Sequence, residues 1–499
     1  MEISFRNDGL SCLRQAAWEV KTEEQTQEVK LPDTMPDVGK VLGAWGQVLI
    51  RGKEWRGSGM SVSGGVMAWV LYLPEGETEP RSVDTWIPFQ IRWDFPQTQR
   101  DGAILAEALL KNIDARSVSA RKLMVRSVVS IAGCAMEPTT VEVFAPDSIP
   151  EDVYLLRSTY PMQIPREYGE KAFNLDEELP LPGSCQSARR LLHYNMHPEI
   201  TDQKIMADKV VFRGTAHIHT LCKCEDGMVK SCHLELPFSQ YGDLEREYDP
   251  NATVRIVPAV TNLDMELQEN GMLRIKAGLV GQYVIYDHKP VEVVEDAYSP
   301  RRSVKLQTIP LQVPSVLEQK QESIQVNQLL EGVSGEVVDI SFVADQPRLD
   351  RRGEGMDMEL QGVFQTLYYD EEGNLTGSNV RWGEERRLDM PRDVKLAATC
   401  RMVGMPQGDP GMEGIRLRMD MSLDTTATEE SGVNMVAGLE LGEITPPATD
   451  RPSLILRRVG EESLWDMAKL YGSTEDAIRK ANGLTDEPVP GQILIIPVA

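Results

Sequence analysis

The stretch Met60–Leu73 reads MSVSGGVMAWVLYL, and two later stretches resemble it: Lys209–Cys222 (KVVFRGTAHIHTLC) and Asp357–Asp370 (DMELQGVFQTLYYD). All three are rich in β-branched or aromatic residues and partly alternate apolar with polar ones, which is typical of β-strands. Each carries a glycine at a matching place. These glycines are Gly65, Gly214 and Gly362, which lie 149 and 148 residues apart. The chain therefore repeats with a period near 150 residues.

Other features recur at the same spacing. They are Leu31-Pro32 with Leu181-Pro182, Pro88-Phe89 with Pro237-Phe238, LMVRSVV from Leu123 with LRIKAGL from Leu273, and a third counterpart, IRLRMDM from Ile415. A period of this length is too long for a solenoid unit and suits whole domains in tandem. We therefore expect three homologous domains at residues 1–150, 151–300 and 301–442.

The local chemistry of each repeat predicts a mainly β fold, with three sandwich-like or barrel-like domains. The segments 225–227 (EDG), 269–271 (ENG) and 371–374 (EEGN) predict hairpin turns, because Asn, Asp and Gly tolerate positive φ. The shared glycine predicts a bulge or a close backbone approach. Outside the C-terminal region, residues 101–112 (DGAILAEALLKN) are the best helix candidate.

Length and charge exclude several classes of protein. The 499 residues are too many for one core, and 41% hydrophobic content can build several. With 52 basic and 77 acidic residues, the net charge of −25 argues against nucleic acid or an anionic membrane surface as the main partner. We expect neither a signal peptide nor a spanning helix, since no apolar run approaches 18 residues.

The seven cysteines are an odd, scattered set: Cys12, Cys134, Cys185, Cys222, Cys224, Cys232 and Cys400. Such a set favours free thiols in a reducing cytoplasm over a disulfide framework.

A different module follows a proline-bearing linker at residues 443–453. Residues 454–499 predict a small βααβ unit. In it Ser463 caps a first helix that ends at Gly472, Ser473 opens a second that ends at Gly483, and Ile493–Ile496 form the closing strand.

This module resembles a LysM domain through three segments: SLWDMAKLYG, KANGL and the closing PGQILIIP. The resemblance implies that the loop before the first helix and the loop after the second flank a binding groove. The residues of that groove would be Glu461, Glu462, Ser463, Trp465, Asn482 and Leu484. Where the family usually has Gly-Asp-Ser/Thr-Leu, this chain has Glu461-Glu462-Ser463-Leu464. Two carboxylates in that loop argue against peptidoglycan binding.

Two groove residues have a simple packing alternative. Trp465 lies at the edge of the apolar stripe of its helix, so it either packs in the core or anchors a contact with a partner. Asn482 either lines the groove or caps the end of the second helix.

The upstream repeats resemble SPOCS domains, which are associated with spore coats. The resemblance rests on LPDTMPDVGKVL (31–42), VLYLPEG (70–76), WIPFQI (86–91) and SARKLMVRSVV (119–129). Three such domains before a LysM module resemble the layout of the SipL-like coat morphogenetic proteins of clostridia. That layout implies a cytoplasmic mother-cell protein that attaches the coat to the forespore, with the LysM module docking on the spore morphogenetic ATPase.

No motif for catalysis is present: G-x-x-x-x-G-K-[ST], H-E-x-x-H and G-x-S-x-G are all missing from the sequence. One cluster within 17 residues carries zinc-type ligands: His217, His219, Cys222, Cys224, Cys232 and His233. Strand alternation points the two histidines at 217 and 219 away from the cysteines at 222 and 224. We therefore expect no metal, no cofactor and no enzymatic activity.

The charge is distributed unevenly. From Arg451 onward six basic and seven acidic residues nearly cancel, so residues 1–450 carry −24 of the charge. We interpret the chain as a non-enzymatic adaptor with an acidic body, whose nearly neutral LysM module binds the morphogenetic ATPase. The alternatives are a protein that binds peptidoglycan or N-acetylglucosamine in the spore cortex or cell wall, and an enzyme whose site lies between the repeats.

Overall fold

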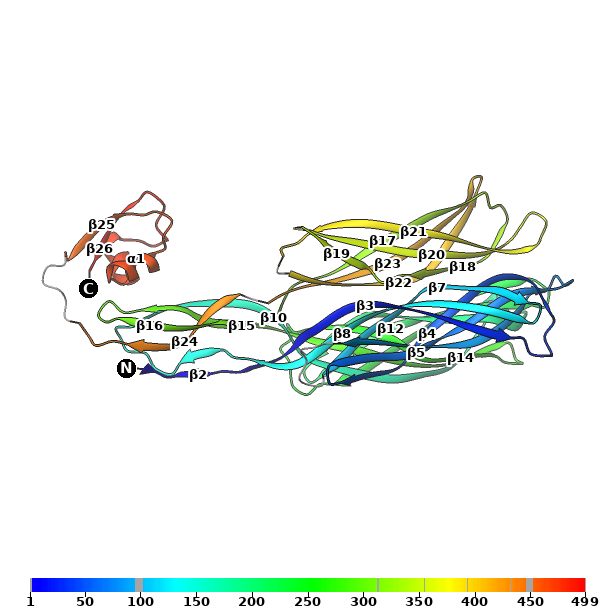
Figure 1. Ribbon diagram of the computed structural model, residues 1–499, viewed down its shortest axis with the longest axis horizontal. Helices are drawn as coiled ribbons and strands as arrows, with labels where there is room; N and C mark the ends of the chain where they lie inside the picture. The colour runs from blue at the N-terminus through cyan, green and yellow to red at the C-terminus, as the bar shows by residue number, and fades with distance from the viewer. Residues whose placement is uncertain are drawn as a thin grey trace.

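The computed structural model describes residues 2–94, 102–311, 314–353, 355–392, 394–430, 432–445 and 452–498. Their regular structure is almost entirely β-strand, so the predicted mainly β class is confirmed. The molecule is elongated: a bundle of long strands lies at one end, a narrow stalk extends from it, and the small C-terminal module lies beside the far end of the stalk (Figure 1).

The bundle has three lobes, which we call lobes I, II and III. Their strands lie within residues 10–141, 154–298 and 314–430, and both ends of the segment 154–298 continue from lobe II into the stalk. Lobe I contains β3 (Leu10–Lys30), β4 (Val38–Arg56), β5 (Gly59–Pro74), β6 (Arg81–Asp94), β7 (Ala103–Ser119) and β8 (Lys122–Val141). Lobe II contains β10 (Tyr154–Pro180), the short 3-10 helix η1 (Gly183–Cys185), β11 (Ala188–Met206), β12 (Lys209–Cys224), β13 (Val229–Asp243), β14 (Thr253–Leu267) and β15 (Met272–Tyr298). Lobe III contains β17 (Pro314–Glu331), β18 (Glu336–Ala344), β19 (Arg348–Arg352), β20 (Gly355–Tyr369), β21 (Leu375–Asp389), β22 (Val394–Gly411) and β23 (Gly414–Glu430).

All three lobes share one strand order. The first strand of each lobe pairs with its last, which pairs with the one before it, in the orders β3-β8-β7, β10-β15-β14 and β17-β23-β22. The middle strands form a second sheet, β4-β5-β6 in lobe I and β11-β12-β13 in lobe II. In lobe III the strand in the place of β4 and β11 is interrupted, so β18 and β19 both pair with β20.

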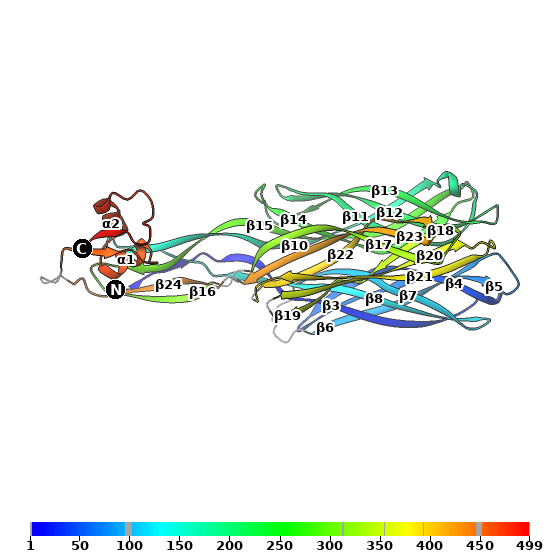
Figure 2. The same cartoon turned by 90° about the horizontal axis from the view of Figure 1, so that it is seen from above.

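Entry and exit strands of the lobes form the stalk. In it β2 (Phe5–Asn7) pairs with β9 (Phe144–Pro146), the start of β10 with the end of β15, and β16 (Val304–Leu311) with β24 (Val433–Leu441). The first strand, β1 (Glu2–Ile3), pairs with β24, so the N-terminal residues close the stalk against the exit of lobe III. Figure 2 shows both termini at the stalk end of the molecule.

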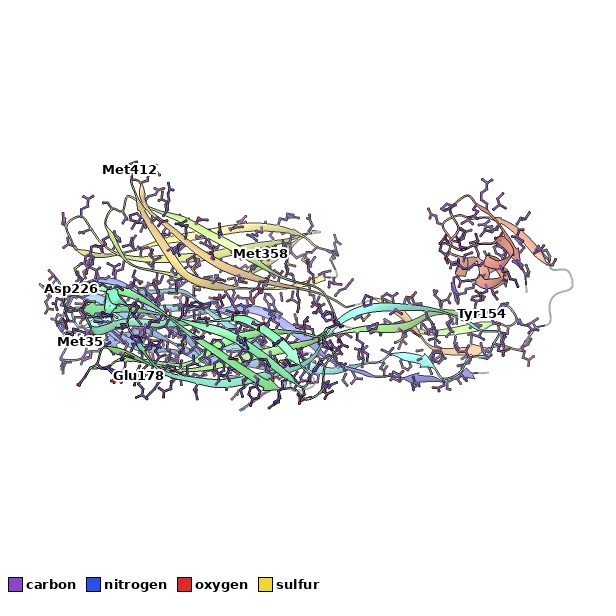
Figure 3. The ribbon with its side chains drawn as sticks, turned by 180° about the vertical axis from the view of Figure 1, so that it is seen from behind. Met35, Tyr154, Glu178, Asp226, Met358 and Met412 are labelled. Carbon is purple, nitrogen blue, oxygen red and sulfur yellow. A yellow bond between two sulfur atoms is a disulfide. The ribbon has the colours of Figure 1, made fainter. Side chains whose placement is uncertain are left out.

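Side chains from all three lobes meet in a shared core. This inter-lobe core consists of Leu42, Trp45, Leu71, Leu192, Leu221, Val229, Leu367 and Leu375. Full burial of such a side chain contributes roughly 1.5–3 kcal/mol, so eight of them hold the lobes firmly together. Figure 3 shows the lobes packed side by side, with Met412 at an outer tip of lobe III.

The predicted close backbone approach is present in lobes I and II. Gly64 lies opposite Ile50, and Gly214 lies opposite Ile200, in each case at the last pair before a bulge in the neighbouring strand. A Cβ atom on Gly64 would lie 2.0 Å from the carbonyl oxygen of Leu49, and one on Gly214 would meet the equivalent oxygen at 2.2 Å. No other residue type fits these positions without a shift of the backbone.

The equivalence of Gly65 with Gly214 is wrong by one residue. Gly64 pairs with Phe89, and Gly214 pairs with Phe238. Lobe I has one residue more between these partners than lobe II, so the spacing between the lobes is 150 residues before the hairpin and 149 after it. Gly362 pairs with Ala344 at the end of β18, where the strand is interrupted.

The turn predictions are confirmed. Gly227, Gly271 and Gly373 lie in three hairpins at φ of 80°, 78° and 79°, which L side chains rarely adopt. The helix prediction for residues 101–112 is wrong, because Ala103–Ser119 form β7, whose hydrogen-bonding partner is β8. Tertiary pairing overrides helix propensity there. Residue 101 lies outside the described part of the chain.

The C-terminal module, called the tail module below, has the predicted βααβ order: β25 (Leu454–Arg458), α1 (Leu464–Tyr471), α2 (Glu475–Asn482) and β26 (Ile493–Pro497). Much of the predicted linker, residues 446–451, lies outside the described residues. Among the described residues, neither helix has the length and apolar character that crossing a membrane requires.

Candidate functional site

Local capping explains how the tail module folds. Ser463 accepts from the backbone N–H of Asp466, and the Asp466 carboxylate accepts from the backbone N–H of Ser463, so α1 begins with a capping box. Gly472 ends α1 at a φ of 64°. The second cap is Thr474, whose hydroxyl accepts from the N–H of Ala477, and not Ser473 as predicted.

Trp465 contacts the stalk. Its side chain is only 6% exposed, and its ring meets that of Tyr298, at the end of β15, edge-on at 4.7 Å. The indole N–H donates to Oδ2 of Asp296 at 2.8 Å, and the Lys469 ammonium lies 2.8 and 2.7 Å from the two oxygens of that carboxylate. Trp465 is therefore a contact residue, but its partner is the chain's own stalk.

Tyr298 provides further contacts between the stalk and the tail module. Its hydroxyl donates to the carbonyl oxygen of Ser473 at 3.1 Å, and its ring stacks on Tyr154 at 5.6 Å. Figure 3 places Tyr154 on the stalk next to the module. Tyr298 belongs to the same hydrophobic cluster as the module's own core residues Leu464, Met467 and Ile478, while Tyr154 packs against it. The module is thus packed against the stalk by apolar, hydrogen-bonding and charged contacts.

The residues of the predicted loop before α1 lie at the module surface. Glu461 is exposed, whereas Glu462 pairs with Arg457 at 3.0 Å. Backbone hydrogen bonding and the Arg457 guanidinium lower the pKa of Glu462. The Ser463 hydroxyl is used in the cap of α1. This loop therefore presents at least one carboxylate that remains charged at neutral pH.

The other two predicted groove residues, Asn482 at the end of α2 and Leu484 after it, hold the module together. Asn482 donates to the carbonyl oxygens of Ile478 and Ile495 at 2.8 and 2.6 Å, and its own oxygen accepts from the N–H of Ile495 at 2.7 Å. It therefore ties α2 to β26, and the helix stops at Gly483. Leu484 packs partly buried against the module core.

The tail module also has an exposed apolar surface that the sequence motifs do not indicate. Leu456 lies directly opposite Ile495 on the two-stranded sheet, and Leu454 and Ile493 are on the same face by strand alternation. Their exposed fractions are 59% for Leu454, 74% for Leu456, 60% for Ile493 and 37% for Ile495. We call these four residues the tail sheet face. Neighbouring exposed apolar residues on one face make this surface a candidate interaction site.

A signal for this face exists in the sequence. The runs LIL at 454–456 and ILII at 493–496 are apolar without alternation, which predicts strands with two apolar faces. In a two-stranded sheet backed by two short helices, only one face can be covered. Ile455, Leu494 and Ile496 point into the module core, and the tail sheet face remains outside.

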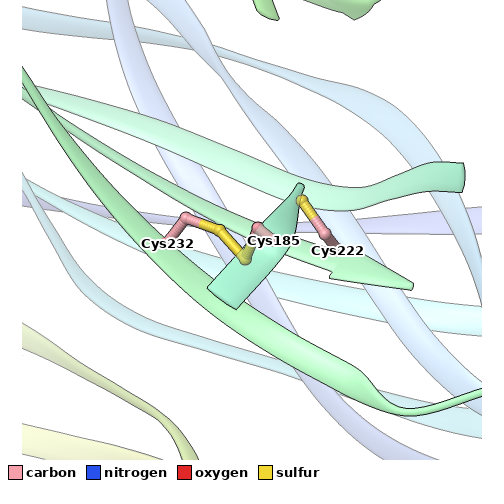
Figure 4. A group of neighbouring side chains, drawn as sticks. All are labelled: Cys185, Cys222 and Cys232. Carbon is pink, nitrogen blue, oxygen red and sulfur yellow. A yellow bond between two sulfur atoms is a disulfide. The ribbon is translucent and has the colours of Figure 1, made fainter. Parts of the chain in front are cut away.

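The predicted His/Cys cluster is divided between the two faces of its sheet, as alternation indicates. His217 contacts Glu199 and His219 contacts Asp339, while Cys222 lies with Cys185 and Cys232 in the core of lobe II (Figure 4). Cys185 and Cys232 are joined by a disulfide, which corrects the expectation of free thiols only. Burial raises the pKa of Cys222 to about 11, so it is a poor nucleophile and ligand.

The remaining two members of that cluster, Cys224 and His233, do not join either group of candidate ligands among the described residues. Cys224 is buried as a free thiol, and His233 stacks on His219 at a ring distance of 4.9 Å.

A polar cleft of about 360 Å³ lies between lobes II and III. Arg401 on its wall pairs with Asp424 and lies 3.7 Å from the Glu107 carboxylate of lobe I. Burial raises the pKa of Glu107. Because the guanidinium is already paired between two carboxylates, the arrangement is that of an ion-pair network that ties the lobes together.

Two family models match the chain: "SipL, SPOCS domain" at residues 187–268 and "LysM domain" at residues 460–497. The first spans β11 to β14 of lobe II, and the second covers the tail module from the loop before α1 to the end of β26. Comparisons with curated proteins and with solved structures found no match. An SPOCS domain and a LysM domain support a sporulation-associated protein with a module of the cell-wall or glycan-binding type. The chain thus carries an SPOCS domain of the SipL type and a C-terminal LysM domain, the domain combination of a SipL-like protein.

Proposed function

We propose that this chain is a non-enzymatic adaptor in spore-coat assembly, which tethers the coat at the forespore surface inside the mother cell. In this proposal the LysM module binds the spore morphogenetic ATPase, and the lobes bind other coat proteins. The lobes are proposed to be three homologous SPOCS domains, at residues 1–150, 151–300 and 301–442. Their common strand order supports this division.

The observation that carries the proposal is the tail sheet face. It is apolar and solvent-exposed, and it belongs to a module seated at the stalk, away from the lobes (Figure 1). A two-ended molecule of this kind suits a tether, because each end can engage a different partner. Leu456 is 74% exposed, and full burial of a leucine side chain against a partner contributes roughly 1.5–3 kcal/mol.

The loop before α1 is proposed to border the same partner. Glu461 and Glu462 supply charge, and charged residues at a rim set specificity and association rate more than affinity. Trp465 is not part of this partner surface, because it is buried against Tyr298 and Asp296.

A capture experiment tests the adaptor proposal. The full chain and a chain ending at Pro446 are used as baits in extracts of sporulating cells, and recovery of the morphogenetic ATPase is quantified. The proposal expects recovery with the full chain only. Equal recovery with the shortened chain would show that the tail module does not dock the ATPase.

The LysM match favours a second candidate function, which is binding of peptidoglycan or N-acetylglucosamine. Titration of the full chain with chitin oligomers separates the two candidates. Saturable binding that is lost in the shortened chain supports the glycan function. The adaptor proposal expects no saturation.

A further inference from the structure

Three buried side chains from two lobes converge beside the inter-lobe core. They are His193 on β11, His219 on β12 and Asp339 on β18, and each is at most 2% exposed. One ligand atom from each lies within 4.8 Å of the other two. Nε2 of His219 is 2.6 Å from Oδ1 of Asp339, and Nε2 of His193 is 3.7 Å from Oδ2.

The cluster leaves polar atoms without hydrogen bonds. Among the described residues, neither ring nitrogen of His193 has a hydrogen-bond partner, and neither has Oδ2 of Asp339. Burying a polar atom in this state is unfavourable, and native proteins rarely do it without a ligand, a water or an ion. An imidazole presents only one of its nitrogens to a given ion, and here Nε2 of His193 faces Oδ2 of Asp339 at 3.7 Å. These two unpartnered atoms therefore point to a missing ligand between them.

The surroundings of His193 are aromatic and apolar. The Trp45 ring of lobe I stacks on the His193 ring at 4.9 Å and 13°, and Trp69 approaches it at 6.4 Å. Within the described part of the chain, the ion-pair partners of Asp339 are only the two histidines. A carboxylate without Lys or Arg in such a place needs another positive charge.

The donor set and its spacing fit a metal ion. Two imidazoles and one carboxylate are typical ligands of Zn²⁺, at bond lengths of about 2.0–2.1 Å. Such bonds place neighbouring ligand atoms of a tetrahedral ion about 3.3 Å apart. The 3.7 Å between His193 and Asp339 is too long for a hydrogen bond but close to that spacing.

We propose that His193, His219 and Asp339 bind one divalent metal ion of the first transition row, Zn²⁺ by donor type. Binding displaces the proton shared by Nε2 of His219 and Asp339, and this proton leaves to solvent. The fourth position is left for a water. Because two ligands come from lobe II and one from lobe III, the ion clamps these lobes in one relative orientation.

This site differs from the His/Cys cluster that the spacing in the sequence suggests. It shares only His219 with that cluster. His193 lies 26 residues upstream of His219, and Asp339 comes from lobe III, 120 residues downstream of His219. The neighbouring Cys185–Cys222–Cys232 group does not compete, since two of its sulfurs are in a disulfide.

The test uses the purified full chain, produced with zinc in the medium and dialysed without chelator. Metal content is measured by elemental analysis, and Co²⁺ exchanged into the site is followed by its visible absorption. We expect one zinc per chain, a Co²⁺ spectrum of a four-coordinate site with nitrogen and oxygen ligands, and a Tm that falls after removal of the metal with a chelator.

Three variants locate the ion. His193→Gln and Asp339→Asn should each lower the metal affinity by at least about tenfold. His217→Gln should retain the wild-type affinity, because His217 lies on the same strand as His219 but outside the proposed metal site. If the two ligand variants do not fold, the metal content, the Co²⁺ spectrum and the Tm of the wild-type chain still test the proposal. Metal-free wild type with no Co²⁺ spectrum and no change of Tm with zinc would overturn the proposal, as would full retention of metal in the folded Asp339→Asn variant.

Discussion

Trp465 of the tail module donates its indole N–H to Asp296 of the stalk at 2.8 Å, and the same carboxylate holds Lys469. One acidic residue therefore bridges two positions of α1 to the end of β15. This contact determines which surface of the tail module remains available for a partner. It turns Trp465 inward, while the tail sheet face stays in solvent.

Replacing Asp296 with Ala is expected to loosen the module from the stalk. Hydrogen bonds to charged groups contribute about 1.5–3 kcal/mol, and the change also leaves the Trp465 N–H without its acceptor. Hydrogen exchange of residues 293–298 and 464–471 should become at least about tenfold faster. Glu292→Ala is the matched control, because it removes an ion pair with Arg157 that lies at the surface. Unchanged exchange in Asp296→Ala would contradict this account of the contact.

The close backbone approach at Gly214 makes a strong prediction for stability. A Cβ there meets the Glu199 carbonyl oxygen at 2.2 Å and the Phe238 ring at 2.4 Å. Gly214→Ala should therefore destabilise the fold by about 1–3 kcal/mol through overpacking, seen as a lower denaturation midpoint. Gly183→Ala, where a Cβ meets nothing within 4 Å, should leave the midpoint unchanged. Equal midpoints for the two variants would refute the assigned strand register.

Arg401 is predicted to be essential to the assembly of the lobes. Arg401→Met removes the guanidinium, so the Glu107 and Asp424 carboxylates lose their shared ion-pair partner. Breaking a buried pair in this way costs about 3–5 kcal/mol. Chemical denaturation should show this loss, while Arg418→Met, which breaks an exposed pair with Asp409, should cost less than about 1 kcal/mol. A small effect of Arg401→Met would mean that the network does not hold the lobes together.

His197 gives the fold a pH dependence. Burial lowers the pKa of His197 from 6.5 to about 4, and His217 and Arg401 add smaller contributions in the same direction. The hydrogen bond between the His197 ring and the Met402 carbonyl oxygen, at 2.5 Å, raises the pKa but does not offset the burial. Above pH 6.5 the ring is neutral in both states. As pH falls from 6.5 to about 4, the unfolded chain binds the proton first, and up to about 3 kcal/mol of stability is lost.

The His197→Gln variant isolates this effect, because the amide keeps a donor but does not titrate. Denaturation at pH 7 and at pH 4.5 should show a larger drop for the wild-type chain than for the variant. Equal drops would show that His197 is not the residue responsible.

Much of the local structure follows from the sequence. Gly227, Gly271 and Gly373 mark hairpins because their φ values require glycine, and the Ser463–Asp466 spacing marks the start of α1. The sequence alone does not distinguish Thr474, the actual cap of α2, from its neighbour Ser473, because both residues carry a hydroxyl. Residues 103–112 join a strand because β8 offers a partner, which a local pattern does not reveal.

The sites depend on contacts that are distant in the sequence. Asp296 is 169 residues from Trp465, and Asp339 is 120 residues from His219. No spacing rule connects such pairs, because the packing of lobes and stalk brings them together. The sequence therefore predicts that Trp465 makes a contact or packs, but not that its partner is the stalk.

A titration of the purified morphogenetic ATPase with the full chain tests whether the ATPase docks on the tail sheet face. The Leu456→Glu/Ile495→Glu double variant places two charges at the centre of the face, whereas Leu317→Glu changes a leucine of lobe III that is 51% exposed. We expect the wild-type chain and Leu317→Glu to bind alike and the double variant to bind at least about a hundredfold more weakly, a loss of about 2.8 kcal/mol. Wild-type affinity in the folded double variant would show that the ATPase does not dock on this face.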